Sequence, residues 1–131
     1  SVLFRYWDHN ILVDTTPDFR FQALRSGMKR LDAILFTHAH ADHVLGLDDV
    51  RPFNFWHRKP IPIYGSSETM TSLERIFAYI FTPDQKATAI PKLEPNVFQD
   101  DAFELFGLEV QPIRVNHGTS CTAFGLAARP I

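Results

Sequence analysis

The segment AILFTHAHADH, residues 33–43, joins a short apolar run directly to three histidines and an aspartate. Its first four residues are all apolar, which is typical of a strand buried on both faces of a sheet. The polar cluster that follows therefore lies at the carboxyl end of a strand. In open α/β sheets, loops at this edge gather side chains around ligands, so we expect a site here.

The residues of this cluster are those that bind metal ions. Alternate side chains of an extended segment point the same way, so we expect His38, His40 and Asp42 to converge, while His43 points elsewhere and can serve a second ion. Imidazole and carboxylate groups suit Zn²⁺, Fe²⁺ or Mn²⁺. The alternative is a chance run of polar loop residues. If the six His and ten Asp were placed at random, H-x-H-x-D-H would arise with a probability on the order of 10⁻³.

The other histidines differ in their surroundings. His117 follows an alternating strand and precedes a glycine, so we predict that it completes a three-histidine set with His38 and His40. His9 in a hairpin turn and His57 in a polar loop are interpreted as solvated side chains. Cys121 is interpreted as a small strand residue rather than a nucleophile.

Strands and helices alternate along the chain, which predicts an α/β layer architecture in one domain, residues 1–131. We expect a hairpin over 1–14 and a helix that Thr16 caps and Gly27 ends, with Phe21, Leu24 and Met28 on one face. The later expected elements are a strand at 61–64, a helix capped by Ser66 or Ser67 with Met70, Leu73, Phe77 and Ile80 in the core, a loop between Pro91 and Pro95, an edge-like strand at 108–115 that tolerates Pro112, and a strand at 122–128.

The composition limits the classes of partner. A formal net charge of -2 gives no broad basic field, so nucleic-acid binding is unsupported, although it is not excluded. A single cysteine cannot form an internal disulfide, and no apolar run approaches the ~20 residues that span a bilayer. We therefore expect a soluble, cytoplasmic protein that does not bind membranes.

Taken together, the strand 11–14, the segment THAHADH at 37–43 and His117 after a later strand resemble the metallo-β-lactamase superfamily. The segments DTTPDFR at 14–20 and GLDDVRPFNF at 46–55 resemble its branch of phosphoribosyl cyclic phosphate phosphodiesterases, with tRNase Z a more distant relative. The resemblance implies an αββα sandwich, of which this chain is roughly the first half. It further implies a small phosphodiester as the substrate.

The resemblance also implies roles for individual residues. His38, His40 and His117 would bind one Zn²⁺, and Asp42 and His43 a second, with Mn²⁺ or Fe²⁺ as alternatives. The two ions would share a hydroxide that attacks phosphorus, and Asp42 would orient it. Asp14 would accept a hydrogen bond from a ligand imidazole, unless it is only a turn residue at the end of a strand.

The chain departs from the family pattern after His117, where it contains no Asp, Glu or His. A bridging aspartate and a last histidine of the family are thus absent. We therefore expect a missing C-terminal portion, and we expect the chain alone to bind one metal and to have little hydrolase activity. An uncovered sheet face favours self-association. The alternatives are a thioester or lactam hydrolase on the same fold, and a metal-binding fragment without catalysis.

Overall fold

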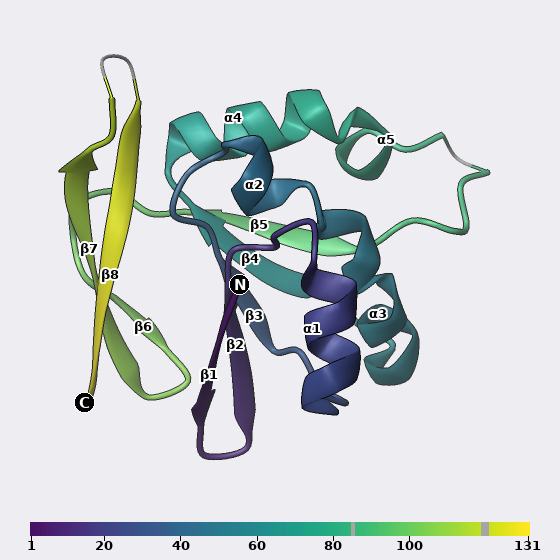
Figure 1. The fold of residues 1–131 in the computed structure, drawn as a ribbon, viewed down its shortest axis with the longest axis horizontal. Helices are drawn as coiled ribbons and strands as arrows, with labels where there is room; N and C mark the ends of the chain where they lie inside the picture. The colour runs from purple at the N-terminus through teal and green to yellow at the C-terminus, as the bar shows by residue number, and fades with distance from the viewer. Residues whose placement is uncertain (85, 119–120) are drawn as a thin grey trace.

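The computed structural model describes residues 1–84, 86–118 and 121–131, which form two sheets and a set of short helices (Figure 1). The strands are β1 (Val2–Tyr6), β2 (His9–Val13), β3 (Ala33–Leu35), β4 (Ile61–Gly65), β5 (Leu93–Val97), β6 (Phe103–Leu105), β7 (Leu108–Asn116) and β8 (Thr122–Pro130). The helices are α1 (Phe19–Ser26), α2 (Ala41–Val44), the 3₁₀ helix η1 (Leu47–Val50), α3 (Arg51–His57), α4 (Ser67–Ile76) and α5 (Ala78–Phe81). The predicted α/β class is confirmed.

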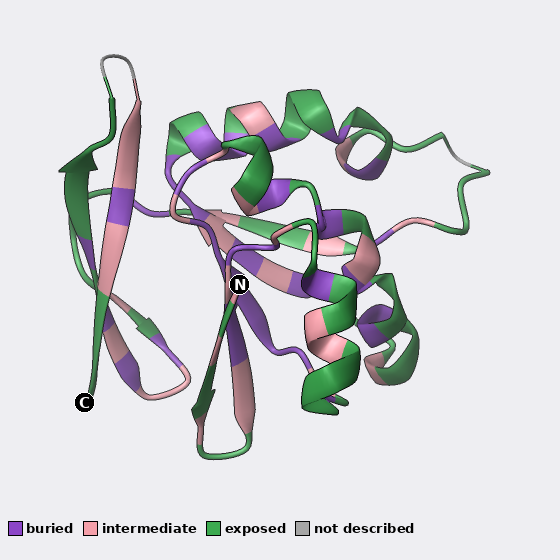
Figure 2. Ribbon diagram, in the orientation of Figure 1, coloured by how far each residue is buried: buried purple, intermediate pink, exposed green. Residues whose placement is uncertain are grey.

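The larger sheet lies between the helices and the smaller sheet (Figure 1). Its strand order is β1-β2-β3-β4-β5, and the smaller sheet has the order β6-β7-β8. Ile34 packs in the apolar cluster beneath the helices, whereas Ala33 and Leu35 pack in the cluster against the smaller sheet. Figure 2 shows buried residues along these central strands and exposed residues on the outer faces of the helices. The prediction that residues 33–36 are buried on both faces is therefore confirmed.

Four neighbouring strands of the larger sheet are parallel, and this places their carboxyl ends at one edge. β2 pairs with β3, β3 with β4, and β4 with β5, all in parallel, while β1 joins β2 as an antiparallel hairpin. Leu35 of β3 aligns with Val13 of β2. The residues that follow these two strands, Asp14 and the segment 36–43, therefore leave the sheet side by side.

The helix α1 differs from the prediction in its start and in its buried face. It begins at Phe19 rather than after Thr16, whose hydroxyl bonds to Ser1 and Gln22 and does not cap the helix. Its end at Gly27 is confirmed, with the left-handed conformation that glycine adopts easily (φ 65°). Phe19 is buried beside Phe53, and this contact sets the rotation of the helix. Met28 is buried, as predicted, but the side chains at 21 and 24 point outward, at 72% and 70% exposure.

Two further predictions near the prolines need correction. The expected loop between Pro91 and Pro95 contains β5, which tolerates Pro95 because it is an edge strand with one neighbour. β6 was not predicted; it pairs with the start of β7 across a two-residue turn, Phe106 and Gly107, with φ angles of 53° and 86°. The expected edge-like strand at 108–115 is instead the middle strand of the smaller sheet. β6 pairs only with its first three residues, and Pro112 lies beyond them, where β7 pairs with β8 alone.

The predicted helix after residue 66 is confirmed, with a break near its end. The Ser66 hydroxyl accepts a hydrogen bond from the Thr69 amide at 3.1 Å, which is the N-cap interaction. The four predicted core side chains, at 70, 73, 77 and 80, are all buried. The chain bends at Phe77 (φ -113°, ψ 45°), so this segment forms α4 and α5.

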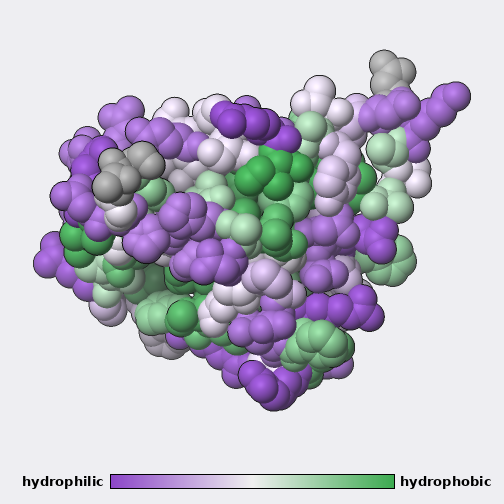
Figure 3. All heavy atoms as spheres, turned by 45° about the horizontal axis from the view of Figure 1, so that its top comes forward, coloured by the Kyte–Doolittle hydropathy of each residue, from purple (hydrophilic) through white to green (hydrophobic). Residues whose placement is uncertain are grey.

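The surface carries both hydrophilic and hydrophobic residues. With the top of the molecule turned towards the reader, hydrophilic residues surround a smaller hydrophobic cluster near the centre of the face (Figure 3). Within the described residues, every helix is too short or too polar to cross a bilayer. This agrees with the expectation from the sequence that no apolar run spans a membrane.

Candidate metal centre

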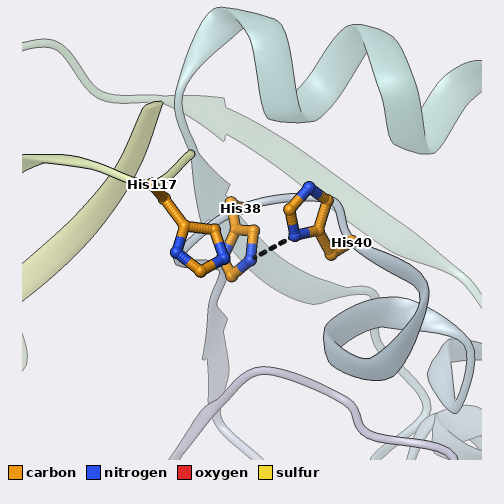
Figure 4. A group of neighbouring side chains, drawn as sticks. All are labelled: His38, His40 and His117. Atoms are coloured by element: carbon orange, nitrogen blue, oxygen red, sulfur yellow. Dashed lines mark hydrogen bonds between the residues drawn. The ribbon is translucent and has the colours of Figure 1, made fainter. Parts of the chain in front are cut away.

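The structure brings three histidines together from two distant parts of the chain. His38 and His40 follow β3, and His117 follows β7 on the other sheet (Figure 4). One ring nitrogen from each lies within 4.8 Å of the others. His38 Nε2 is 3.1 Å from His40 Nδ1. Nitrogen ligands of a tetrahedral Zn²⁺ lie about 3.4 Å apart when each Zn–N bond is about 2.1 Å, so small side-chain shifts would suffice to hold one ion.

The local backbone explains which donors join this group. His40 is extended (φ -65°, ψ 148°), so His38 and His40 keep the alternate spacing of a strand. The helix α2 begins at the next residue, and the extended pattern ends there. Asp42 lies in the first turn of α2 with an 80% exposed side chain and is not one of the three residues of this group, and its role as a ligand stays a prediction. Its Oδ2 lies 3.5 Å from His43 Nε2 instead.

His117 reaches the other histidines because β8 docks onto the chain just before them. The Phe124 amide donates to the carbonyl of Thr37 at 2.9 Å, which joins the small sheet to the segment after β3. The His117 amide donates to the Cys121 carbonyl at 3.0 Å. These bonds hold the end of β7 above the carboxyl end of β3. The prediction that His117 joins His38 and His40 in space is confirmed, while its role as a ligand stays a prediction.

A buried carboxylate organises the neighbouring side chains. Asp14 has an Oδ1 that accepts from the Thr37 amide at 2.8 Å, and an Oδ2 that accepts from the Thr37 hydroxyl at 2.7 Å and from His43 Nδ1 at 2.8 Å. Its backbone is left-handed (φ 59°), a strained conformation for a residue with a side chain. The expected hydrogen bond from an imidazole to Asp14 is thus present, with His43 as its donor.

These hydrogen bonds determine which ring nitrogens carry lone pairs. Because Asp14 only accepts, His43 carries its proton on Nδ1 and leaves Nε2 free. The Thr37 hydroxyl gives its one proton to Asp14, so it accepts from His38 Nδ1, 3.0 Å away. The lone pair of His38 therefore lies on Nε2, the atom that faces His40. The sequence analysis did not identify Thr37. A hydroxyl residue next to a histidine at the end of a strand could have suggested a hydrogen bond that orients the imidazole.

The surroundings of His38 favour its neutral form. Burial lowers the pKa of His38, and the imidazoles of His43 and His40 lower it further. The Asp14 carboxylate acts in the opposite direction as a smaller effect. A neutral imidazole is the form that binds a metal, so the position favours a ligand over a cation.

Backbone contacts between residues 14–16 and 43–46 hold His43 against Asp14. The Thr15 amide donates to the His43 carbonyl at 2.8 Å, and the Gly46 amide donates to the Thr15 carbonyl at 2.9 Å. The two segments approach so closely that a Cβ on Gly46 would lie 2.0 Å from the Thr16 carbonyl oxygen. Glycine is therefore required at position 46.

Replacing Gly46 with alanine should separate these segments. Relieving the overlap with a backbone oxygen should cost about 1–3 kcal/mol of unfolding free energy, and it should weaken the contact between His43 and Asp14. Chemical denaturation measures the first effect, and the nitrogen chemical shifts of the His43 ring measure the second. The control is Gly125→Ala, where the nearest neighbour lies 3.8 Å from the added carbon and φ is not positive, so stability should change little. Unchanged stability in Gly46→Ala would contradict the close approach.

The two remaining histidines lie outside the site, as predicted, but they are not fully solvated. The His9 ring stacks on Phe106 at 4.1 Å between centroids. Nε2 of His57 is buried, and it has no hydrogen-bond partner among the residues described. The residues around each histidine do not predict this burial, because it depends on the tertiary structure: His9 contacts the turn before β7, and His57 lies at the end of α3.

The comparisons with known proteins agree with this arrangement. The β-lactamase superfamily domain matches residues 9–129, nearly the entire chain. The chain belongs to the metallo-β-lactamase superfamily. The crystal structure of a diphosphatase from the PhnP family superposes with a TM-score of 0.83 and 40% identity, covering 96% of this chain and 46% of that one. The predicted superfamily and fold are therefore confirmed.

Two curated proteins are also similar to this chain. An octanoyltransferase of Porphyromonas gingivalis is 41% identical over 109 residues, which cover 82% of this chain and 22% of that protein. A ribonuclease Z of Clostridium acetobutylicum is 26% identical over 133 residues, which cover 96% of this chain and 43% of that protein. The chain thus spans less than half the length of either relative.

Proposed function

We propose that the protein is a metal-dependent hydrolase that cleaves phosphodiesters at a dinuclear site. The observation that carries this proposal is the group of His38, His40 and His117, with His43 held beside it by Asp14. The ring centroids of His38 and His43 are 4.1 Å apart, so the two sets of donors adjoin. The similarity to a diphosphatase and to a ribonuclease Z, both enzymes of phosphate chemistry by name, supports the choice of substrate class.

The residues divide between two neighbouring positions. The three-histidine group would hold one Zn²⁺, because three nitrogen donors with one open position are typical of catalytic zinc. Nε2 of His43 and the carboxylate of Asp42, 3.5 Å apart, would contribute to the second. When bound, such ions supply positive charge for the phosphoryl oxygens and activate water at neutral pH. Mn²⁺ or Fe²⁺ would suit the same donors.

The protein's own side chains set the protonation and exposure of the site. Asp14 fixes the tautomer of His43, and Thr37 fixes that of His38, so both rings direct lone pairs towards the site. Asp42 and His40 are exposed to solvent, which leaves an open approach for a substrate. The exposed Asp42 carboxylate can accept a proton from water that enters this space.

The substrate class is tested with the complete gene product and three substrates: bis-(p-nitrophenyl) phosphate, a thioester and a β-lactam. We expect turnover of the phosphodiester alone, its loss with EDTA, and its recovery on adding Zn²⁺ or Mn²⁺. The thioester is included because the octanoyltransferase relative is named for the transfer of an acyl group. Turnover of only the thioester or the lactam, or phosphodiester turnover that EDTA leaves unchanged, would contradict the proposal.

A further inference from the structure

A cleft of about 830 Å³ lies between α3 and the segment that leads into β5. It opens where β4 and β5 begin, because its lining includes Pro60 and Lys92, the residues just before these strands. The three histidines belong to the opposite edge of the sheet, and Figure 1 shows α3 well away from α2. The five residues of β4 set the two edges roughly 13 Å apart, at about 3.3 Å per residue. The cleft is therefore separate from the candidate metal centre.

The lining of this cleft carries a concentrated positive charge. It includes Arg51, Arg58, Lys59 and Lys92, and it contains no aspartate or glutamate. Across the described ranges, none of these four side chains forms an ion pair with a carboxylate. The whole chain has a formal net charge of -2, so its composition does not indicate this local positive charge. Unpaired cations around a concave surface attract an anion.

Two exposed aromatic side chains line the same cleft. Phe55 is 81% exposed and Trp56 is 55% exposed, so both rings are accessible to a ligand. Trp56 packs edge to face on the buried Phe53, with 5.4 Å between the ring centroids. Aromatic rings beside cations suit a ligand in which a planar ring accompanies a phosphate.

A buried asparagine joins the two walls of the cleft. The Nδ2 of Asn54 donates to the carbonyls of Lys59 at 3.1 Å and Lys92 at 2.8 Å, while its Oδ1 accepts from the Lys92 amide at 2.9 Å. The Arg51 guanidinium also donates across the cleft, to the Ala89 carbonyl at 3.0 Å. The bonds to Lys92 and Ala89 join residues 38 apart in sequence. The walls are thus held in place before any ligand arrives, which lowers the entropic cost of binding.

We propose that this cleft binds a nucleotide, either free or as a unit of single-stranded RNA. The basic side chains contact the phosphate, and Phe55 and Trp56 stack on the base. The volume lies within the range of about 300–1,000 Å³ that is typical of ligand clefts. The proposal does not depend on the metal-dependent function, because it uses none of the histidine site.

Binding is tested with AMP and with a fluorescein-labelled ten-residue 2′-O-methyl oligo(A), which resists cleavage. In Lys59→Glu/Lys92→Glu we expect affinity to fall on the order of tenfold, and the slope of log K against log salt to become shallower by about 0.7 for each lost phosphate contact. In Phe55→Ala we expect roughly a fivefold or larger loss with an unchanged salt slope. Lys29→Glu/Arg75→Glu changes the net charge equally outside the cleft and should bind within about twofold of wild type.

The outcomes separate the two sources of the ligand. Binding of AMP supports a free nucleotide, and binding of the oligonucleotide alone supports RNA. Failure of both to bind, equal binding by the cleft variants and wild type, or equally tight binding of a polyglutamate peptide would each overturn the proposal. Hydrolase activity should be unchanged in the cleft variants, so failure here is distinct from failure of the proposed function.

Discussion

Replacing His40 with alanine is expected to lower the affinity for Zn²⁺ by on the order of a hundredfold or more. Loss of a side chain that only supports a ligand already costs 10- to 100-fold, and His40 would be a ligand itself. The metal-free protein should keep its stability within about 0.5 kcal/mol, because the His40 side chain is exposed and packs in neither apolar cluster. Competition with a chromophoric chelator measures the affinity, and thermal unfolding with EDTA measures the stability.

The control for this variant is His57→Ala, which removes the same chemical group outside the site. It should bind Zn²⁺ as tightly as wild type. If His40→Ala retained wild-type affinity while His57→Ala lost it, the metal would bind elsewhere and the three-histidine group would have no role as a ligand set.

Replacing Asp14 is expected to disturb both stability and metal binding. In Asp14→Ala the Thr37 amide and hydroxyl and the His43 ring lose their acceptor, which should cost about 2–4 kcal/mol of unfolding free energy. Asp14→Asn tolerates the left-handed backbone and keeps one acceptor oxygen, so it should lose less stability. Without a carboxylate to fix the tautomer of His43, affinity at the second metal position should still fall about 10- to 100-fold.

Asp14→Gly separates the two contributions of this residue. Glycine adopts a φ of 59° without strain, so it should be about 1 kcal/mol more stable than Asp14→Ala, while both lack the carboxylate. Denaturation curves give the stabilities, and titration of the second metal equivalent gives the affinity. A second-site affinity equal to wild type in all three variants would show that Asp14 serves the fold alone.

The sequence predicted the parts of the site that depend on strand geometry. A run of four apolar residues was enough to place His38 at the carboxyl end of a strand buried on both faces, because such burial requires apolar side chains on both sides. The alternation of residues 108–115 placed His117 at the end of another strand. Both patterns lie within a single strand, so they can be recognised without knowledge of the tertiary structure.

Other features depend on contacts between distant segments and could not be predicted in this way. The helix α2 begins at Ala41, so Asp42 does not follow the alternate spacing of His38 and His40, and nothing in THAHADH indicates where the extended backbone ends. The helix α1 follows the packing of Phe19 against Phe53, so the apolar residues 21 and 24 became exposed. The cationic cleft joins residues 51–60 to 88–92, which no composition can reveal.

The proposed function depends above all on His38, His40 and His117 binding one metal ion together, and the structure places one ring nitrogen of each within 4.8 Å of the others. The most direct test is a crystal structure of the protein grown with Zn²⁺ and measured at the zinc absorption edge. We expect an anomalous peak with all three imidazoles at about 2.0–2.1 Å. Zinc bound at other residues, or a structure in which saturating Zn²⁺ leaves these three rings without a peak, would contradict the claim.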